Sequence, residues 1–221
     1  ATANATNVAA FVADSDTVNS GTATLTAISS GGIIDLTSAG GSTGYTIVSG
    51  AGTDTLKGDD GNDTFTISAA GEGNNDTIDG DAHTGGSGDT IELSTGSHTF
   101  STDNKILNIE TIATHTSGST VILTGQTENF TITGNSGADI ITGGNAVDTV
   151  NAGNGNDSIT GGAGNDIITG GSGNDTFNVN LGTDTITDLS TGDDLIVSSG
   201  AIATATNIAS FVADSDTLNS G

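Results

Sequence analysis

The chain has 221 residues, enough for one large domain or two small ones, and a formal net charge of −25. Lys57 and Lys105 are its only basic residues, so it lacks the positive charge that binds nucleic acid phosphates or anionic membrane surfaces. There is no Cys, which excludes disulfides and thiolate metal sites, and no apolar run approaches the roughly 20 residues of a membrane span. We therefore expect neither nucleic acid binding nor membrane insertion.

The composition favours strands and turns over helices. Gly occurs 35 times, aromatic residues make up 3%, and single Ile, Val, Leu and Phe residues are spaced among Thr, Asn, Asp and Gly. The one hint of helical spacing is in Asn7–Asp14, where Val8, Phe11 and Val12 fall on one side. The chain does not begin with Met and shows no signal-peptide pattern, so we interpret it as a segment of a longer protein.

The first 21 residues return at the end of the chain. Ala1–Gly21 is repeated as Ala201–Gly221 with mostly conservative differences. We interpret residues 1–30 and 200–221 as joints, the starts of two successive units in a tandem array, with Phe11 and Phe211 mediating association with copies of the same protein. The alternative is that both copies are related caps on a single domain.

A loose repeat follows in residues 31–93, which we expect to form a first β-roll segment. Asp54 and Asp63 are nine residues apart, and each precedes a large apolar residue by two places. Asp76 precedes Ile78 and Asp89 precedes Ile91 in the same way, but these steps are thirteen residues long. Residues 94–133 keep strand-like pieces without Gly-Asp turns, so we expect an irregular continuation of the solenoid there.

A regular nine-residue repeat occupies residues 134–199. Each repeat has Asp at its sixth place and a large apolar residue at its eighth, and Leu123 and Ile132 extend the apolar phase backwards. The Asp residues are Asp139, Asp148, Asp157, Asp166, Asp175, Asp184 and Asp193, and the apolar residues are Ile141, Val150, Ile159, Ile168, Phe177, Ile186 and Leu195. Chance does not hold two residue types in register over seven periods.

This period predicts half a coil of a flattened solenoid. Six turn-prone residues precede three strand-prone ones, whose middle residue points inward because side chains alternate along a strand. Two repeats make a coil of eighteen residues. One edge then stacks Asp139, Asp157 and Asp175, and the other stacks Asp148, Asp166 and Asp184, with Asp193 able to close that row.

Such rows of carboxylates predict bound cations. Stacked coils bring the carboxylates about 4.8 Å apart, and almost no Lys or Arg is present to relieve their repulsion. Several Ca²⁺ ions suit these sites, because Ca²⁺ accepts six to eight hard oxygen ligands in irregular geometry. The predicted carboxylate ligands are the seven Asp residues above together with Asp54, Asp63 and Asp76. The turn carbonyls of Gly134, Gly137, Gly153, Gly155, Gly162, Gly164, Gly171 and Gly173 would complete them. Local Asx turns are the alternative, and they explain isolated residues such as Asp35 or Asp103.

The nonapeptide resembles the RTX (hemolysin-type) calcium-binding repeat. The resemblance extends over Gly134–Val197 and, less regularly, Ser49–Ile91. It implies an all-β, right-handed parallel β-roll or β-solenoid with Ca²⁺ in its turns, and export by a type I secretion system. Asn145–Ala146–Val147 lacks the fourth-place Gly, so we expect weak binding at Asp148, and Val179–Asn180 lacks both leading glycines.

We expect no catalytic residue and no small-molecule substrate. His83, His98 and His115 are interpreted as exposed loop residues, and no pair of acidic residues has catalytic spacing. The ninth places carry Thr or Asn, as on ice-binding solenoids, although plain solvent exposure explains them better. These places are Thr142, Asn151, Thr160, Thr169, Asn178 and Thr187.

The sequence therefore favours a calcium-stabilised structural unit of a secreted, self-assembling bacterial surface protein, such as an S-layer, sheath or filament. Its expected location is extracellular or at the cell surface. The alternatives are the stalk of a giant RTX adhesin, the RTX tail of a secreted enzyme or toxin, and an ice-binding solenoid.

Overall fold

The structure, a computed structural model, describes residues 2–41, 43–71, 75–81, 88–206, 208 and 218–219. The described residues form short parallel β-strands joined by turns, and the exception is a single 3-10 turn, η1 (Asp103–Lys105). Successive coils stack strand on strand, which confirms the predicted all-β solenoid. Two compact units make up the chain: Ala1–Ser94 with Thr102–Ile112, and Thr95–Ser101 with Ala113–Gly221.

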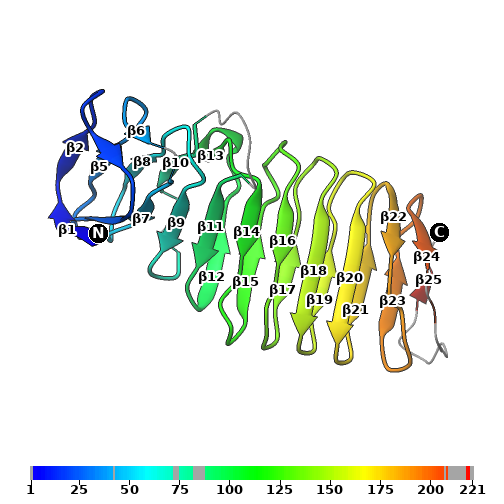
Figure 1. The fold of residues 1–221 in the computed structure, drawn as a ribbon. Helices are drawn as coiled ribbons and strands as arrows, with labels where there is room; N and C mark the ends of the chain where they lie inside the picture. Colours follow the sequence, from blue (N-terminus) through cyan, green and yellow to red (C-terminus); the bar gives the residue numbers. More distant parts are fainter. Residues whose placement is uncertain are drawn as a thin grey trace. The chain divides into compact units, whose positions relative to one another are not determined.

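The first unit contains two parallel sheets and a short strand pair (Figure 1). One sheet contains β1 (Thr2–Val8), β4 (Thr22–Ala27), β7 (Thr46–Val48), β9 (Thr64–Ile67) and β11 (Thr90–Leu93). The other contains β2 (Ala10–Val12), β5 (Ile33–Asp35), β8 (Thr55–Lys57), β10 (Thr77–Asp79) and β13 (Ile106–Leu107). The pair is β3 (Val18–Asn19) with β6 (Gly40–Gly41). Strand β14 (Thr111–Ala113) spans the boundary between the units in the sequence.

The second unit is the more regular one. One sheet contains β16 (Thr131–Thr133), β18 (Thr149–Asn154), β20 (Ile167–Ser172), β22 (Thr183–Ile186) and β24 (Ile202–Ala205). The other contains β12 (Gly96–Thr99), β15 (Ser119–Ile122), β17 (Ile140–Thr142), β19 (Ser158–Thr160), β21 (Thr176–Val179), β23 (Asp194–Val197) and β25 (Leu218–Asn219). Residues eighteen apart pair through most of it, as in Ile140↔Ser158 and Thr149↔Ile167.

The core is the stack of inward residues that the period predicts. Ile141, Val150, Ile159, Ile168, Phe177 and Ile186 are each at most 1% exposed. Burying one such side chain contributes about 1.5–3 kcal/mol, so the thin core depends on every coil being occupied. Leu195 is only half-buried, because it lies in the last full coil before the C-terminal copy of the 21-residue element.

Three expectations from the sequence are wrong. Asn7–Asp14 is not helical, since β1 ends and β2 runs within it, because neighbouring coils offer these residues strand partners. Leu123 is buried but lies after β15, and Val121 pairs with Ile141 in its place, because the turn after β15 is longer than in the regular repeats. His98 is not exposed but fully buried on β12, where it pairs with Val121 in the inward row.

His115 is exposed, as expected, whereas His83 lies outside the described residues. Among the residues described, none belongs to a helix with the length and apolar character needed to cross a membrane.

Candidate metal centre

Every carboxylate predicted to bind calcium points into the roll. Each Asp precedes an inward apolar residue by two places, so the alternation of side chains turns both to the same face. The structure leaves none of these Asp residues more than 5% exposed; they are Asp54, Asp63, Asp76, Asp139, Asp148, Asp157, Asp166, Asp175, Asp184 and Asp193. The turns therefore place ionisable oxygen atoms in a largely desolvated interior.

In the second unit these side chains form two carboxylate ladders. After the first member of each ladder, the Oδ1 atom of each Asp accepts a hydrogen bond from the backbone N–H of the Asp eighteen residues earlier. The first ladder joins Asp139, Asp157, Asp175 and Asp193 at N···O distances of 2.8–2.9 Å. The second joins Asp148, Asp166 and Asp184 at 2.8 and 3.1 Å. Asp193 thus closes the first row, not the second as expected from the sequence, since it lies eighteen residues after Asp175.

The first unit builds the same ladders with coils of unequal length. Asp54 bonds to the Gly32 N–H at 2.5 Å, and Asp76 bonds to that of Asp54 at 2.8 Å. On the other edge Asp63 bonds to Tyr45 and Asp89 bonds to Asp63, at 2.5 and 2.6 Å.

Two members of the first-unit ladders are absent from the predicted ligand set. Asp89 accepts the Asp63 N–H across a 26-residue step, and Glu110 Oε2 accepts the Asp89 N–H at 2.7 Å across 21 residues. The available signal was local: each precedes a buried Ile, Ile91 or Ile112, by two places. A fixed nine-residue period does not find them.

The second carboxylate oxygen divides the turns into two kinds. In the closed turns, which end at Asp54, Asp63 and Asp148, Oδ2 accepts the N–H of the residue four places earlier at 2.8–2.9 Å. In the open turns, which end at Asp157, Asp166 and Asp184, Oδ2 is buried and has no hydrogen-bond partner. An unsatisfied buried carboxylate oxygen costs at least the 1–3 kcal/mol of a lost hydrogen bond, which a bound cation would offset.

Backbone conformation accompanies this division. Gly153 and Gly162, four places before Asp157 and Asp166, have φ of 101° and 105°. The corresponding residues of the closed turns, Gly50, Asp59 and Gly144, are not in this left-handed region. Glycine adopts this region with little strain, so in the turns at Asp157 and Asp166 the second-place glycine allows the N–H to point away from Oδ2. The turn at Asp184 is open without such a glycine, since its second-place residue is Asn180.

The eight glycines proposed to supply carbonyl ligands lie in the turns that end at Asp139, Asp157, Asp166 and Asp175. The carbonyls of Gly137, Gly153, Gly155 and Gly164 face the glycine of the next coil so closely that a Cβ there would collide with them. The Gly134 carbonyl accepts a hydrogen bond from the Thr114 hydroxyl. Gly162, Gly171 and Gly173 have φ of 105°, 101° and 143°. Backbone oxygens and carboxylates therefore share one layer.

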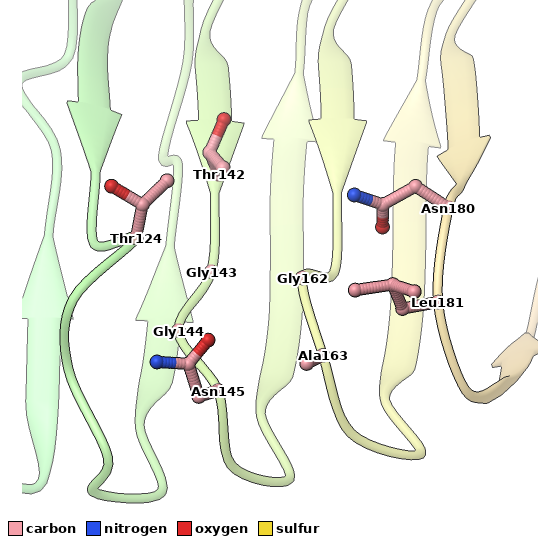
Figure 2. Close-up of a pocket in the computed structure, with 9 residues that line it drawn as sticks. All are labelled: Thr124, Thr142, Gly143, Gly144, Asn145, Gly162, Ala163, Asn180 and Leu181. Carbon is pink, nitrogen blue, oxygen red and sulfur yellow. The ribbon is translucent and has the colours of Figure 1, made fainter.

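A shallow pocket borders the turns that end at Asp148, Asp166 and Asp184 (Figure 2). Glycine residues from successive coils, Gly143, Gly144 and Gly162, line it, and Asn180 stands where the second leading glycine is missing. The lining residues are Thr124, Thr142, Gly143, Gly144, Asn145, Gly162, Ala163, Asn180 and Leu181. The turn backbone of this row thus faces a recess rather than packed side chains.

Burial raises the carboxyl pKa values. Desolvation raises the pKa of Asp139, Asp148, Asp175 and Asp184 to about 6, and it also raises the pKa of Asp157 and Asp166. Asp63 and Asp89 reach a pKa of about 7, because desolvation is joined by repulsion from other carboxylates, Asp59 among them. Their ionised forms thus need positive charge nearby.

The donor set fits calcium. No three acidic or histidine side chains converge on one point within the described ranges. A cation here would therefore be held by one or two carboxylates together with turn carbonyls. Such an all-oxygen, irregular set suits Ca²⁺, whereas Zn²⁺ prefers His and Cys and Mg²⁺ demands octahedral geometry.

Comparison with known families agrees with this chemistry. The family model described as RTX calcium-binding nonapeptide repeat (four copies) matches residues 46–66, 131–159 and 151–186. These matches contain the turns of Asp54, Asp63 and the two ladders of the second unit up to Asp184, and they confirm the resemblance noted from the sequence. No curated protein and no solved structure matches the chain.

Proposed function

We propose that this chain, which carries RTX calcium-binding nonapeptide repeats, is a structural repeat unit of a secreted, self-assembling bacterial surface protein such as an S-layer, sheath or filament. The observation that carries the proposal is the return of Ala1–Gly21 as Ala201–Gly221 at the far end of a calcium-type β-roll. A unit that ends by beginning again belongs to a tandem array, and arrays of solenoid units build extended structures.

Calcium has a structural role in this proposal. The open turns bury carboxylate oxygens without a donor, so binding of several Ca²⁺ ions supplies free energy for folding. Extracellular calcium modules have Kd values of about 10⁻⁴–10⁻³ M. The open turns would accordingly stay poorly folded where calcium is scarce and complete their folding outside the cell, where RTX repeats typically function. We assign it no catalytic role.

The second candidate is the stalk of a giant adhesin, which the same tandem repeat supports. The tail of a secreted enzyme or toxin is less well supported, since such a tail normally occurs once behind a catalytic domain. Coat and stalk differ in whether neighbouring chains contact each other side by side.

The test is negative-stain imaging and far-UV circular dichroism of the full chain in EDTA, in millimolar Mg²⁺ and in millimolar Ca²⁺. We expect Ca²⁺ alone to at least double the β-signal and to give sheets or filaments. Separate particles with a calcium-induced β-signal would replace the coat by the stalk. A β-signal that is the same in EDTA and in Ca²⁺ would overturn the calcium role in both.

A further inference from the structure

The 21-residue element that occurs twice is seen in two different environments. Its first copy, Ala1–Gly21, contributes β1, β2 and β3 to the first unit, and its second copy, Ala201–Gly221, contributes β24 and β25 to the second. The strand pairs correspond closely: β24 (Ile202–Ala205) is the copy of Thr2–Ala5, and β25 (Leu218–Asn219) is the copy of Val18–Asn19. Phe211 lies outside the described residues.

In the first copy, every partner follows the element in the chain. Strand β1 pairs with β4 in the register Ala3↔Ala23 and Ala5↔Leu25, and β3 pairs with β6 in the register Val18↔Gly40. Phe11 of β2 pairs with Ile34 of β5. The Val8 carbonyl accepts the N–H of Ile28 at 3.1 Å.

In the described part of the second copy, both strands pair with strands that precede the element. Strand β24 pairs with β22 in the register Thr185↔Thr204 and Ile186↔Ala205, and β25 pairs with β23 in the register Ile196↔Leu218. The Thr206 N–H donates to the Ile186 carbonyl at 2.8 Å, and that of Ile202 donates to Gly182 at 3.0 Å.

The two copies therefore use opposite edges of the same strands. In both, the strand is parallel to its neighbour and turns the same residues inward: Ala3 and Ala5 lie in register with the row of Leu25, and Ala203 and Ala205 with that of Asp184 and Ile186. Crossovers between parallel strands are nearly always right-handed, so the earlier coil always lies on one edge and the later coil on the other. Among the described strands, β1 and β24 each lie at the end of the sheet, so each leaves unpaired the edge that its counterpart has paired.

The inward side chains of the first copy are less buried than those of the next coil, because no described coil covers them on the other side. Ala3 and Ala5 are exposed and Phe11 is half-buried. In the next coil, Leu25, which pairs with Ala5, is 9% exposed, and Ile34, which pairs with Phe11, is 0% exposed. Ala203 and Ala205, which have a coil on the other side, are half-buried. An unpaired parallel edge with an open apolar row is a template for a further strand.

We propose that the element is a coil shared between successive units, so that a tandem array forms one uninterrupted solenoid rather than beads on linkers. The occupant of the free β24 edge is the β4 strand of the next unit, in the register Thr204↔Thr24. The occupant of the free β1 edge is the β22 strand of the preceding unit. This deepens the proposed function, resting on it only for the tandem arrangement, and it holds for a coat or a stalk alike.

The test uses the full chain followed directly by a second copy of residues 22–221. The chain has no Cys, so introduced thiols report single contacts. Thr204→Cys combined with Thr24→Cys in the appended copy should give a disulfide in more than about half of the folded molecules, because adjacent parallel strands bring in-register Cβ atoms close enough to form one. Thr204→Cys combined with Thr22→Cys in the appended copy is two residues out of register, so its disulfide should form at least tenfold more slowly.

Two measurements keep this test decisive. Thr185→Cys with Thr204→Cys in the single chain reports folding, since the structure pairs these residues. Amide exchange of the unmodified two-unit chain should slow at least tenfold at Ala203 and Ala205, whose N–H groups alternate with those facing β22. The shared coil would be overturned if the Thr185–Thr204 control forms its disulfide while Thr204 forms no crosslink to the appended copy and amide exchange at Ala203 and Ala205 does not slow. That result leaves calcium-dependent assembly, tested by imaging, unaffected.

Discussion

The turns at Asp54 and Asp63 in the first unit and those at Asp157 and Asp166 in the second share one nonapeptide pattern, yet they treat the carboxylate differently. The first pair closes each carboxylate with a turn N–H, and the second pair leaves one buried oxygen without a donor. The difference arises from a second-place residue that is left-handed at Gly153 and Gly162 but not at Gly50 or Asp59. The repeat motif thus determines the position of the carboxylate, whereas the turn backbone determines whether its second oxygen has a hydrogen-bond donor or depends on a cation.

The carboxyl of a closed turn can still have a strongly raised pKa. The turn at Asp63 is closed, but burial raises the pKa of this carboxyl to about 7, with a further contribution from repulsion by Asp59 and Asp89. At Asp166 desolvation raises the pKa, and the buried Oδ2 has no hydrogen-bond donor. Both units therefore contain carboxyls with raised pKa values, about 7 at Asp63 and Asp89 in the first unit and about 6 at Asp139, Asp148, Asp175 and Asp184 in the second. We expect both units to respond to protons, the first at the higher pH.

Removal of calcium should produce the largest contrast between the units. The N–H groups of Asp139, Asp148 and Asp166 are held by carboxylates of open turns, and those of Gly32 and Tyr45 by closed ones. We expect EDTA to speed amide exchange about 100-fold or more at the first three and less than about tenfold at the other two, since local opening follows local stability. Hydrogen exchange read by NMR or mass spectrometry measures this. Equal acceleration at both sets would remove the distinction between open and closed turns.

The same substitution, Asp→Asn, should change calcium affinity in an open turn, at Asp157, and stability in a closed turn, at Asp148. At Asp157 the amide keeps an oxygen for the Asp139 N–H, so in EDTA the variant should be as stable as the parent, but its calcium midpoint should rise about tenfold. At Asp148 an NH₂ group would meet the Gly144 N–H, so stability should fall by about 1–3 kcal/mol with and without calcium.

Calcium titrations followed by circular dichroism, together with thermal melts, compare the two variants. Asp103→Asn, in the exposed 3-10 turn, is the control that should change neither quantity. The assignment of turns fails if Asp148→Asn shifts the calcium midpoint more than Asp157→Asn does.

Acid should have a smaller effect, of opposite sign with and without calcium. The folded pKa of about 6 at Asp139, Asp148, Asp175 and Asp184, and of about 7 at Asp63 and Asp89, lies above the ordinary value of 3.8. The folded state then binds protons more tightly, so in EDTA stability is greatest below about pH 4 and is lost as pH rises through 6 to 7.

In calcium the same protons compete with the metal, so stability should instead fall as pH drops below about 6. Thermal melts from pH 4.5 to 8 in both buffers measure the effect. The first unit, with its higher pKa values, should still lose stability between pH 6.5 and 7.5 in EDTA after the second has levelled off. A melting temperature in EDTA that rises with pH would contradict the assigned burial of these carboxyls.

The sequence predicted the fold and the carboxylate rows because both follow from one period. Where coils lengthen, the period fails: Leu123 was put in a row that Val121 occupies. Asp89 was noticed but left out of the ligand set, and Glu110 was missed, because they lie 26 and 21 residues from the residues that they bond to. The division into open and closed turns was not predictable, because Gly144 and Gly162 are the same residue type at the same place with different φ. The expected weakness at Asp148 came from a missing fourth-place glycine, whereas the structure shows a closed Oδ2 there.

The carboxylate ladders also have a mechanical consequence. Each Asp side chain joins its own coil to an amide of the coil before it, so an inner coil is held on both sides and an end coil on one. Under tension the roll should therefore unravel from an end, coil by coil. The pulling force needed to start unravelling is then set by the end coil rather than by the average one, and a further coil placed over that end would raise it.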